Sequence, residues 1–595
     1  MKINEKISRI RSLMKQANIS AYIIPSTDPH MSEYIPAYWK GREYVSEFTG
    51  SSGTLVITDK ASGLWTDGRY YIQAENQIAE SEIRLYKVGE KDVPTYTQYL
   101  GKVLDKGQCV GLDGRLFSAI TIKRMKKVFE EKNIKLVCDI DLLNSIWHNR
   151  PALMLTNLYI HDKVYTGLTA YEKIRDVRKV MLQKGIQGYL ITDLASIAWL
   201  FNIRGNDIPY NPMVIAYAFV TIDNAYLCTY TERIKEETKQ ILQAQGITLK
   251  KYEAIEELIN NIKSPMTILC NENQLNYSLY QLLAENNHIT ISNQADFIMQ
   301  QKAIKNKVEI ENIKKAHIKD GCALVEFTMA LEDLLAKGEQ LTEYSLVNML
   351  KAARLKQVNN KGESFAPIVA YKENAAMMHY MPNEITSKCL ENKGLLLVDS
   401  GGQYLEGTTD ITRTLALGQT STEEKLHYTL VLKAHIALAK AVFMKGCTGA
   451  NLDILARAPL WEKGLDYKCG TGHGVGFFLG VHEGPQSLRM SNHIPLKVGM
   501  LLTDEPGIYI QDKHGIRIEN ILLVVEHIQT INGTFYHFEP VTYFPIDTKP
   551  LLIKLLSKEE RDWLNNYHKM VYEKLSPYLE GRALNWLREK TVSIE

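Results

Sequence analysis

The chain has 595 residues, a length that predicts three or four domains of about 150 residues each. With 45% hydrophobic and 23% charged residues, it has the composition of a globular protein, which excludes a disordered, collagen-like or coiled-coil chain. Its 70 lysines and arginines nearly balance 68 aspartates and glutamates, so the charge favours neither nucleic acid nor an anionic membrane as a partner.

The targeting and redox features of the chain predict a cytoplasmic protein. The first residues are charged and lack the apolar run of a signal peptide. No stretch approaches the roughly 20 apolar residues that are needed to cross a bilayer. The eight cysteines are scattered singly, without a Cys-x-x-Cys pair, as expected for reduced and mostly buried thiols.

The first half of the chain contains a weak internal repeat. The segment Met14–Ile24 resembles Met181–Ile191 at an offset of 167 residues. Each reads as the end of an amphipathic helix, a tight turn and a short apolar strand. We therefore predict two successive α/β domains of similar topology, at residues 1–151 and 152–307, with chance similarity as the alternative. Further strand-like runs follow in the two halves, at Thr54–Thr58 and Tyr217–Ile222.

The third predicted domain, residues 308–595, mixes helices with strands. A helical pattern runs over Val308–Leu335, and Gly338 is its expected stop. The charged, aromatic tail from about residue 546 is expected to form a helical extension that packs on this domain. The predicted strands are Leu395–Val398, Thr408–Leu417, Met500–Thr503 and Ile516–Val525.

A second helix of this domain has a clear start signal. Ser421 and Glu424 have the spacing of a capping box, in which each side chain satisfies a backbone N–H of the other. We predict that this helix runs toward Phe443.

Two aspartates of the third domain flank a predicted hairpin. Asp399 follows an apolar strand, and ten residues separate it from Asp410; their midpoint falls between Tyr404 and Leu405, near Gly407. A hairpin centred there would place the two aspartates roughly opposite each other, with Cβ atoms about 4.5–5.5 Å apart. Two carboxylates at that distance repel each other unless a cation lies between them.

The same arrangement recurs downstream. Glu505 and Glu519 flank a turn-like segment, residues 512–515, which lies at their midpoint. His473, in a glycine-rich segment, adds an imidazole. Four carboxylates and one histidine would nearly neutralise two divalent cations, and mostly oxygen ligation with one nitrogen suits Mn²⁺, Co²⁺ or Zn²⁺.

Each signal also has a simpler interpretation. A single Asp-x10-Asp pair is most often two exposed hairpin carboxylates. The segment around His473 could be purely structural or could bind phosphate. However, its glycines are not followed by Lys-Ser/Thr, and no dinucleotide-binding pattern fits. The five residues together, in this order, are far more specific than any one of them.

Residues 310–545 resemble the pita-bread metallopeptidase domain shared by methionine aminopeptidase, prolidase, creatinase and aminopeptidase P. The five metal ligands of that family occur in order, in the motifs V-D-S-G, T-T-D-I-T-R-T, G-T-G-H-G-V-G, T-D-E-P-G and R-I-E-N. The two preceding domains, the motif V-H-E-G-P and the tail extend the resemblance to the long, three-domain cytosolic Xaa-Pro aminopeptidases, over essentially the whole chain. The matching ligand positions are Asp399, Asp410, His473, Glu505 and Glu519.

The resemblance implies an α/β (α+β) fold, with two creatinase-N-like domains before a pita-bread domain. It implies that Asp410 and Glu519 bridge two divalent cations, most simply Mn²⁺, while Asp399 completes the coordination of one cation and His473 and Glu505 that of the other. A hydroxide held between the cations would attack the peptide, and Glu505 would manage its proton. The implied substrates are peptides with proline in second position, and the implied assembly is a homodimer formed through the catalytic domain.

The resemblance also implies roles for four residues beyond the ligands. His379 and His482 match family histidines that orient substrate and stabilise the intermediate. A single histidine next to methionines, as His379 is, is more often simply packed in the core. Arg69 matches a position where the first domain faces the catalytic cleft, and an ion pair with Asp67 on a turn is the alternative. Arg517, two residues before Glu519, could orient the metal ligands.

One position departs from the family pattern. Many relatives have a histidine four residues before the histidine ligand, whereas this chain has Cys469 before His473. We predict that Cys469 lies near the active site and is sensitive to oxidants.

Two other functions occur on the same fold. A prolidase that cleaves Xaa-Pro dipeptides uses the same chemistry, but prolidases are typically shorter than this chain. A binding protein that has lost its metals is the alternative from another class, and the intact ligand set argues against it.

Overall fold

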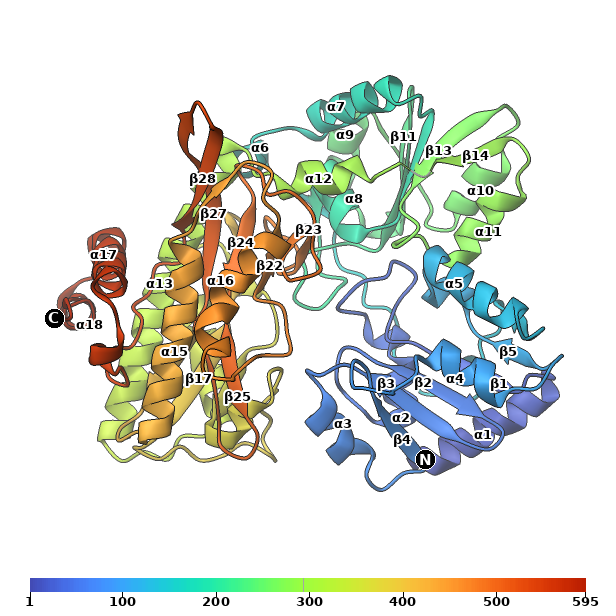
Figure 1. Ribbon diagram of the computed structural model, residues 1–595. Helices are drawn as coiled ribbons and strands as arrows, with labels where there is room; N and C mark the ends of the chain where they lie inside the picture. The colour runs from blue at the N-terminus through green and yellow to red at the C-terminus, as the bar shows by residue number, and fades with distance from the viewer. Residues whose placement is uncertain (293) are drawn as a thin grey trace. The chain divides into compact units, whose positions relative to one another are not determined.

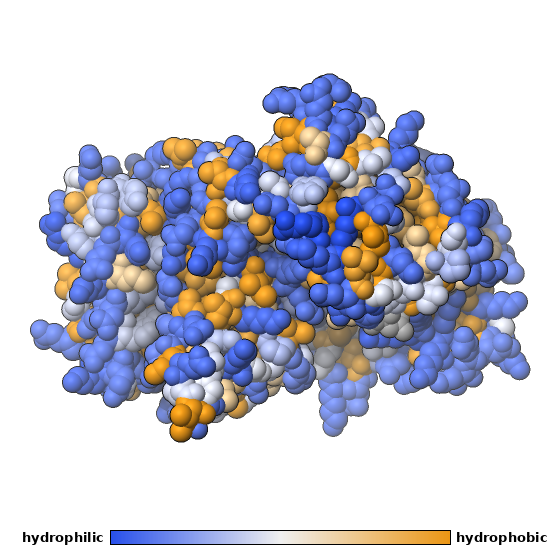
Figure 2. Space-filling view, turned by 90° about the horizontal axis from the view of Figure 1, so that it is seen from above, coloured by the Kyte–Doolittle hydropathy of each residue, from blue (hydrophilic) through white to orange (hydrophobic). Residues whose placement is uncertain are grey.

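The structure is a computed structural model that describes residues 1–292 and 294–595. The chain divides into two compact units, one of Met1–Asp162 and Leu168–Ile298, the other of Lys163–Gly167 and Met299–Glu595. Blue to green ribbons mark the first unit and green to red ribbons the second in Figure 1. Among the described residues, no helix is both long and apolar enough to cross a membrane. On the face shown in Figure 2, apolar side chains lie in small groups among hydrophilic ones, as on most protein surfaces.

The first unit contains two six-stranded sheets of identical topology. The strands of the first sheet are β1 (Ala21–Ile24), β2 (Thr54–Thr58), β3 (Ser62–Thr66), β4 (Ile83–Lys87), β5 (Cys109–Gly111) and β6 (Lys135–Val137). Those of the second are β8 (Gly188–Ile191), β10 (Ala216–Thr221), β11 (Ala225–Thr229), β12 (Ile247–Lys250), β13 (Met266–Cys270) and β14 (Ile289–Ser292). The orders are β4-β3-β2-β1-β5-β6 and β12-β11-β10-β8-β13-β14. In the first sheet β2 pairs antiparallel with β1 and with β3, and in the second β10 pairs antiparallel with β8 and with β11. The other three pairings of each sheet are parallel.

This topology confirms the internal repeat. The strands β1 and β8 start 167 residues apart, which is the offset seen in the sequence. Strand β1 is buried along its whole length because alternate side chains pack with α1 on one face and with α4 and α5 on the other, as its continuous apolar run requires. The main helices of this unit are α1 (Ile3–Gln16), α2 (Gly41–Ser46), α3 (Tyr71–Ile78), α4 (Tyr96–Val103), α5 (Ala119–Glu130), α7 (Ala170–Gln183), α8 (Leu194–Leu200), α9 (Glu236–Ala244), α10 (Ala254–Asn260) and α11 (Tyr277–Glu285).

The second unit packs long helices against curved antiparallel sheets. Figure 1 shows α13, α15 and α16 alongside the strands, with α17 and α18 on the outer side of the helices. The main helices are α13 (Lys307–Ala336), α14 (Glu343–Leu355), α15 (Thr422–Ala439), α16 (Gly449–Trp461), α17 (Lys558–Leu575) and α18 (Gly581–Lys590). One sheet has the order β16 (Ile368–Tyr371), β17 (Leu395–Ser400), β20 (Ile411–Ala416), and another β21 (Val442–Met444), β28 (Gly533–Pro540), β27 (Asn520–Thr530), β24 (Leu501–Asp504).

The helix predictions for this unit are largely confirmed. Helix α13 ends as expected, with Gly338 in the left-handed region at φ +73°. Ser421 and Glu424 form the predicted capping box of α15. That helix runs toward Phe443 as predicted and stops at Ala439, and Phe443 itself lies in β21. There Phe443 pairs with Tyr536 of β28 and joins an aromatic and aliphatic core.

The tail forms α17 and α18, which pack on α13 through apolar side chains and confirm the predicted helical extension. Two predicted strands are interrupted. The segment predicted as Thr408–Leu417 breaks at residues 409–410, and Ile516–Val525 breaks at residues 518–519. Each break falls on a predicted metal ligand, where the backbone leaves the sheet ladder.

Candidate metal centre

The first carboxylate pair lies on the hairpin of β17 and β20. Asp399 pairs with Thr412 across the strands, and Asp410 lies two residues before Thr412, just outside β20. The two aspartates are therefore diagonal neighbours, and the prediction that they lie opposite each other is wrong by two residues. The reason is that the connection is not one simple turn: β18 (Gly402–Tyr404) and β19 (Gly407–Thr408) form a separate sheet with β15 (Asn360–Glu363).

The second carboxylate pair has the predicted register. Asp504 of β24 pairs with Asn520 of β27, and beyond the gap Gly507 of β25 (Gly507–Ile510) pairs with Arg517 of β26 (His514–Arg517). Both ladders share one register, which places Glu505 and Glu519 opposite each other in the gap between them.

The imidazole enters from a third strand pair. His473 lies in β22 (Gly472–Gly474), which pairs with β23 (Glu483–Leu488). The residue before His473 must be glycine, because a Cβ at Gly472 would lie 1.8 Å from the carbonyl oxygen of Thr503. The backbone N–H of His473 donates to Thr503 Oγ1 at 3.0 Å. Its Nδ1 donates to the Gly474 carbonyl at 2.9 Å, which leaves Nε2 as the unprotonated nitrogen that a metal requires.

The two carboxylate hairpins and the β22–β23 pair each bring one predicted ligand to the same place. Asp410, His473 and Glu519 are buried, and one ligand atom from each lies within 4.8 Å of the others. His473 Nε2 is 3.5 Å from Asp410 Oδ2 and 3.4 Å from Glu505 Oε1. Asp399 Oδ1 is buried without a hydrogen-bond partner among the described residues. A buried carboxylate oxygen without a donor is costly, so the donor set fits divalent cations well.

The electrostatics of the cluster support the same conclusion. Burial, with repulsion from neighbouring carboxylates, raises the pKa of Asp410 and of Glu519 well above the ordinary values. Burial is also the largest cause that raises the pKa of Glu505 to about 7. Burial and the nearby His482 lower the pKa of His473 well below its ordinary value. A neutral imidazole beside carboxylates that repel one another is a site in which bound cations would be strongly stabilising.

Arg517 is the positive group that braces this cluster. Its guanidinium forms a buried ion pair with Asp399, and it also donates to Thr412 Oγ1 at 3.1 Å and to Tyr509 Oη at 2.5 Å. Thr412 in turn donates to Glu519 Oε2 at 2.8 Å. These contacts are those that an orienting residue would make.

Four matches to known family models cover most of the chain. Residues 311–526 match metallopeptidase family M24, and residues 534–594 match the C-terminal region of that family. Residues 6–141 and 149–309 each match a creatinase/prolidase N-terminal domain.

Full-length relatives narrow the family further. The chain is 39% identical to aminopeptidase P2 of Arabidopsis thaliana over 628 aligned residues, covering 99% of this chain and 88% of that protein. This chain belongs to the Xaa-Pro aminopeptidase family. A solved X-prolyl aminopeptidase from Caenorhabditis elegans, described as a cytosolic enzyme with a di-nuclear active site, matches with a TM-score of 0.95, 34% identity and full coverage of both chains. An Xaa-Pro dipeptidase from Bacillus anthracis matches with a TM-score of 0.51 and 27% identity, covering 64% of this chain and 99% of its own.

The two histidines that match substrate-orienting positions of this aminopeptidase family lie beside His473. The ring of His482 packs edge-on against that of His473, with centroids 4.2 Å apart at 86°. His379 is partly buried and near enough to contribute to the lowered pKa of His473. Their positions are compatible with the expected roles, which remain predictions.

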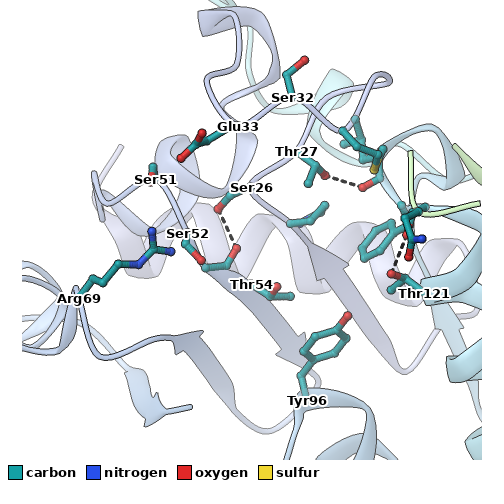
Figure 3. A pocket seen from close by; sticks show the side chains of 17 residues that line it. Ser26, Thr27, Ser32, Glu33, Ser51, Ser52, Thr54, Arg69, Tyr96 and Thr121 are labelled. Atoms are coloured by element: carbon teal, nitrogen blue, oxygen red, sulfur yellow. Dashed lines mark hydrogen bonds between the residues drawn. The ribbon is translucent and has the colours of Figure 1, made fainter. Parts of the chain in front are cut away.

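Arg69 belongs to the first unit, whereas the metal ligands belong to the second. It forms the ion pair with Asp67 that was the alternative interpretation, through Nε–Oδ1 and Nη2–Oδ2 distances of 2.8 Å. Arg69 also lines a pocket of about 460 Å³ whose walls carry many hydroxyl groups (Figure 3).

Cys469 is partly buried, and its backbone carbonyl accepts a hydrogen bond from Arg457 Nη2 at 2.7 Å. Burial, followed by the negative charge of Glu505, raises the pKa of its thiol to about 12. The influence of Glu505 supports the predicted location near the centre. The raised pKa disfavours the reactive thiolate and so argues against the predicted sensitivity to oxidants.

The sequence reasoning missed Thr412 and Thr503, which hold two of the carboxylates. Thr503 Oγ1 donates to Glu505 Oε1 at 3.2 Å, as Thr412 does to Glu519. A signal for both was present: each threonine stands two residues from a ligand on the same strand or its extension, and residues two apart point to the same face. The same rule applies to Arg517.

Proposed function

We propose that this chain is a metallo-aminopeptidase that removes the N-terminal residue of peptides with proline in second position, using two divalent cations. The observation that carries the proposal is the convergence of Asp410, His473 and Glu519, with Glu505 at 3.4 Å from the same imidazole nitrogen. The full-length similarity to aminopeptidases P supports the choice of substrate.

The five ligands have distinct places in this proposal. Asp410 and Glu519, which converge from the two hairpins, would be shared by both cations, with Asp399 on one side and His473 and Glu505 on the other. Bound cations in such a site lower the pKa of a water molecule and polarise the scissile carbonyl.

Glu505 is suited to move the proton. Hydrolysis adds OH to the acyl carbon and H to the proline nitrogen as the C–N bond breaks. The carboxylate of Glu505, whose Oε1 lies 3.4 Å from His473 Nε2, would take a proton from the attacking water and return it to the leaving nitrogen. Thr503 holds Oε1 of this carboxyl group and so fixes its orientation.

The scissile bond itself constrains recognition. The peptide nitrogen of proline carries no hydrogen, and proline restricts the conformation of the residue before it. A site for this bond must therefore orient the substrate through its carbonyl oxygen and its free amino group. His379 and His482, beside His473, are the residues that we assign to this task.

The finer features are part of the same proposal. The ligand set is rich in oxygen, which favours Mn²⁺, with Co²⁺ and Zn²⁺ as alternatives. We also propose a cytoplasmic homodimer formed through the catalytic domain, and domain limits at residues 1–151, 152–307 and 308–595.

Metal-stripped protein titrated with Mn²⁺ tests the proposal. Cleavage of Arg-Pro-Pro, Arg-Ala-Pro and Gly-Pro would be followed by mass spectrometry. We expect release of arginine from Arg-Pro-Pro alone, restored by Mn²⁺. Cleavage of Gly-Pro alone would identify a prolidase instead. Absence of cleavage of all three peptides despite bound metal would refute the proposed function.

A further inference from the structure

A buried cluster of three charged residues lies just outside the metal ligands. Lys302 Nζ is 2.8 Å from Glu483 Oε2, and Lys305 forms an ion pair with the other oxygen, Oε1. The exposed fraction of these side chains is 5% or less. Burying three charges costs several kcal/mol per ion before pairing, so the arrangement is not explained by stability alone.

The place of Glu483 in the fold connects this cluster to the site. Glu483 directly follows His482 and pairs with Gly474, the residue after the ligand His473. The ring of His482 packs edge-on against that of His473. The backbone next to His482 is therefore held by the pairing of β22 with β23 and by the ion pairs that the Glu483 side chain makes with Lys302 and Lys305.

The two lysines are themselves held in place. Lys302 lies in α12 (Phe297–Ala303), and the backbone N–H of Lys305 donates to the Gly499 carbonyl at 2.8 Å. Lys305 Nζ also reaches the Lys302 carbonyl at 3.3 Å. The ammonium groups thus approach Glu483 from an anchored segment.

Each lysine contacts its own oxygen of Glu483, which indicates what the second lysine contributes. One ammonium group would already neutralise Glu483. Two ammonium groups, each on a different carboxylate oxygen, also fix the rotation of the carboxylate plane and therefore the direction of the chain at His482. This is a geometric contribution, because the second cation adds to the cost of burial.

We propose that Lys302 and Lys305, acting through Glu483, are positioning residues that hold His482 against His473 in the orientation required for peptide hydrolysis. This inference rests on the proposed function, in which His482 orients the substrate. It adds three residues to that function.

Single replacements of the lysines test the inference while leaving Glu483 with one lysine partner. Lys302→Met and Lys305→Met each leave one neutral Lys–Glu pair, so both variants should fold. We expect kcat on Arg-Pro-Pro to fall about 10–100-fold, because misplaced supporting residues have effects of this size. The KM and the bound metal should change little. Lys314→Met, which removes a more exposed pair of 2.9 Å with Glu539 in the same unit, is the matched control and should keep wild-type kcat.

A double-mutant cycle separates positioning from general destabilisation. If Lys305 acts through His482, Lys305→Met should cost little further activity in a His482→Ala background. The same fold loss of kcat in both backgrounds would overturn the proposal.

A readout independent of activity completes the test. The ring signal of His482 in a histidine-labelled NMR spectrum, assigned with His482→Ala, should shift or broaden in Lys302→Met and Lys305→Met but not in Lys314→Met. An unchanged ring signal would overturn the positioning role. Failure of the wild-type protein to cleave any Xaa-Pro peptide would instead refute the proposed function, and the ring signal would then decide the positioning role alone.

Discussion

The two hairpins that carry the carboxylates differ in how they are built. In the first, a separate small sheet interrupts the connection, and Asp399 and Asp410 end up two positions out of register. In the second, two ladders of one register flank a short gap, and Glu505 faces Glu519. Sequence spacing locates ligands on a continuous ladder well, but it fails where the chain inserts another element.

The two hairpins also depend on each other. Arg517 of the second hairpin pairs with Asp399 of the first, and Thr412 of the first donates to Glu519 of the second. Arg413 of the first donates to the Glu519 carbonyl at 2.6 Å. Neither hairpin would therefore present its carboxylates correctly alone, and mutations in one should be felt at the other.

The largest expected effect comes from removing one converging carboxylate from each hairpin. Asp410→Asn and Glu519→Gln should each abolish activity and reduce the bound metal, because each removes a charged ligand that lies within 4.8 Å of His473 and of the other carboxylate. Activity assays and elemental analysis of purified protein measure both effects. Near-normal activity in either variant would show that its hairpin does not contribute to the site.

Removing the main contact between the hairpins should have the next largest effect. Arg517→Met leaves Asp399 without its ion pair and removes the hydrogen bond to Thr412, so activity should fall about 10–100-fold. Lys513→Met is the matched control on the same hairpin, since it removes an exposed pair of 2.9 Å with Glu423. Equal kcat/KM values for the two variants would contradict the bracing role of Arg517.

The dependence of stability on pH offers a third way to examine the cluster. The pKa of Glu505 is raised from 4.5 to about 7, and those of Asp410 and Glu519 are raised as well. Above pH 4.5 the folded protein therefore binds more protons than the unfolded chain, and its stability falls as the pH rises through about 7. Relative to Glu505→Gln, the Tm of the metal-free protein should thus decrease by a few °C between about pH 5 and pH 8, because the opposing effect of the lowered pKa of His473 is present in both proteins.

Saturating Mn²⁺ should oppose this decrease, because cations bind the deprotonated ligands. The same change of Tm over this pH range in the metal-free wild-type protein and in metal-free Glu505→Gln would contradict the assignment of a raised pKa to Glu505.

Much of the architecture could be predicted because local patterns recur in the sequence. The repeat at an offset of 167 residues located β1 and β8, and the capping box located the start of α15. The five candidate ligands were found because their motifs occur in a recognisable order. The same-face rule of alternate strand residues would also have found Thr412 and Thr503.

Other features depend on contacts between distant parts of the chain. The pairing of Lys305 with Glu483 joins residues 178 apart, and that of Arg517 with Asp399 joins residues 118 apart. No spacing rule identifies such partners. The strand β21 just after α15 has a similar cause, since Phe443 pairs there with Tyr536 of a strand far along the chain.

The smallest expected effect distinguishes support between the hairpins from support within one. Thr412→Val removes a hydrogen bond to Glu519 from the opposite hairpin, whereas Thr503→Val removes one to Glu505 on its own strand extension and also the acceptor for the His473 N–H. Each change should weaken Mn²⁺ binding by about 10-fold, at the lower end of what such supporting groups contribute. Titration of metal-free protein with Mn²⁺ gives the affinities.

Combining each threonine variant with Arg517→Met then tests whether the hairpins support each other. Because a hairpin keeps its own register, Thr503→Val should leave the pairing of Arg517 with Asp399 intact, so combining it with Arg517→Met should give additive losses. Thr412 touches both Arg517 and Glu519, so Thr412→Val combined with Arg517→Met should give less than additive losses. Additivity in both combinations would mean that the hairpins are supported independently.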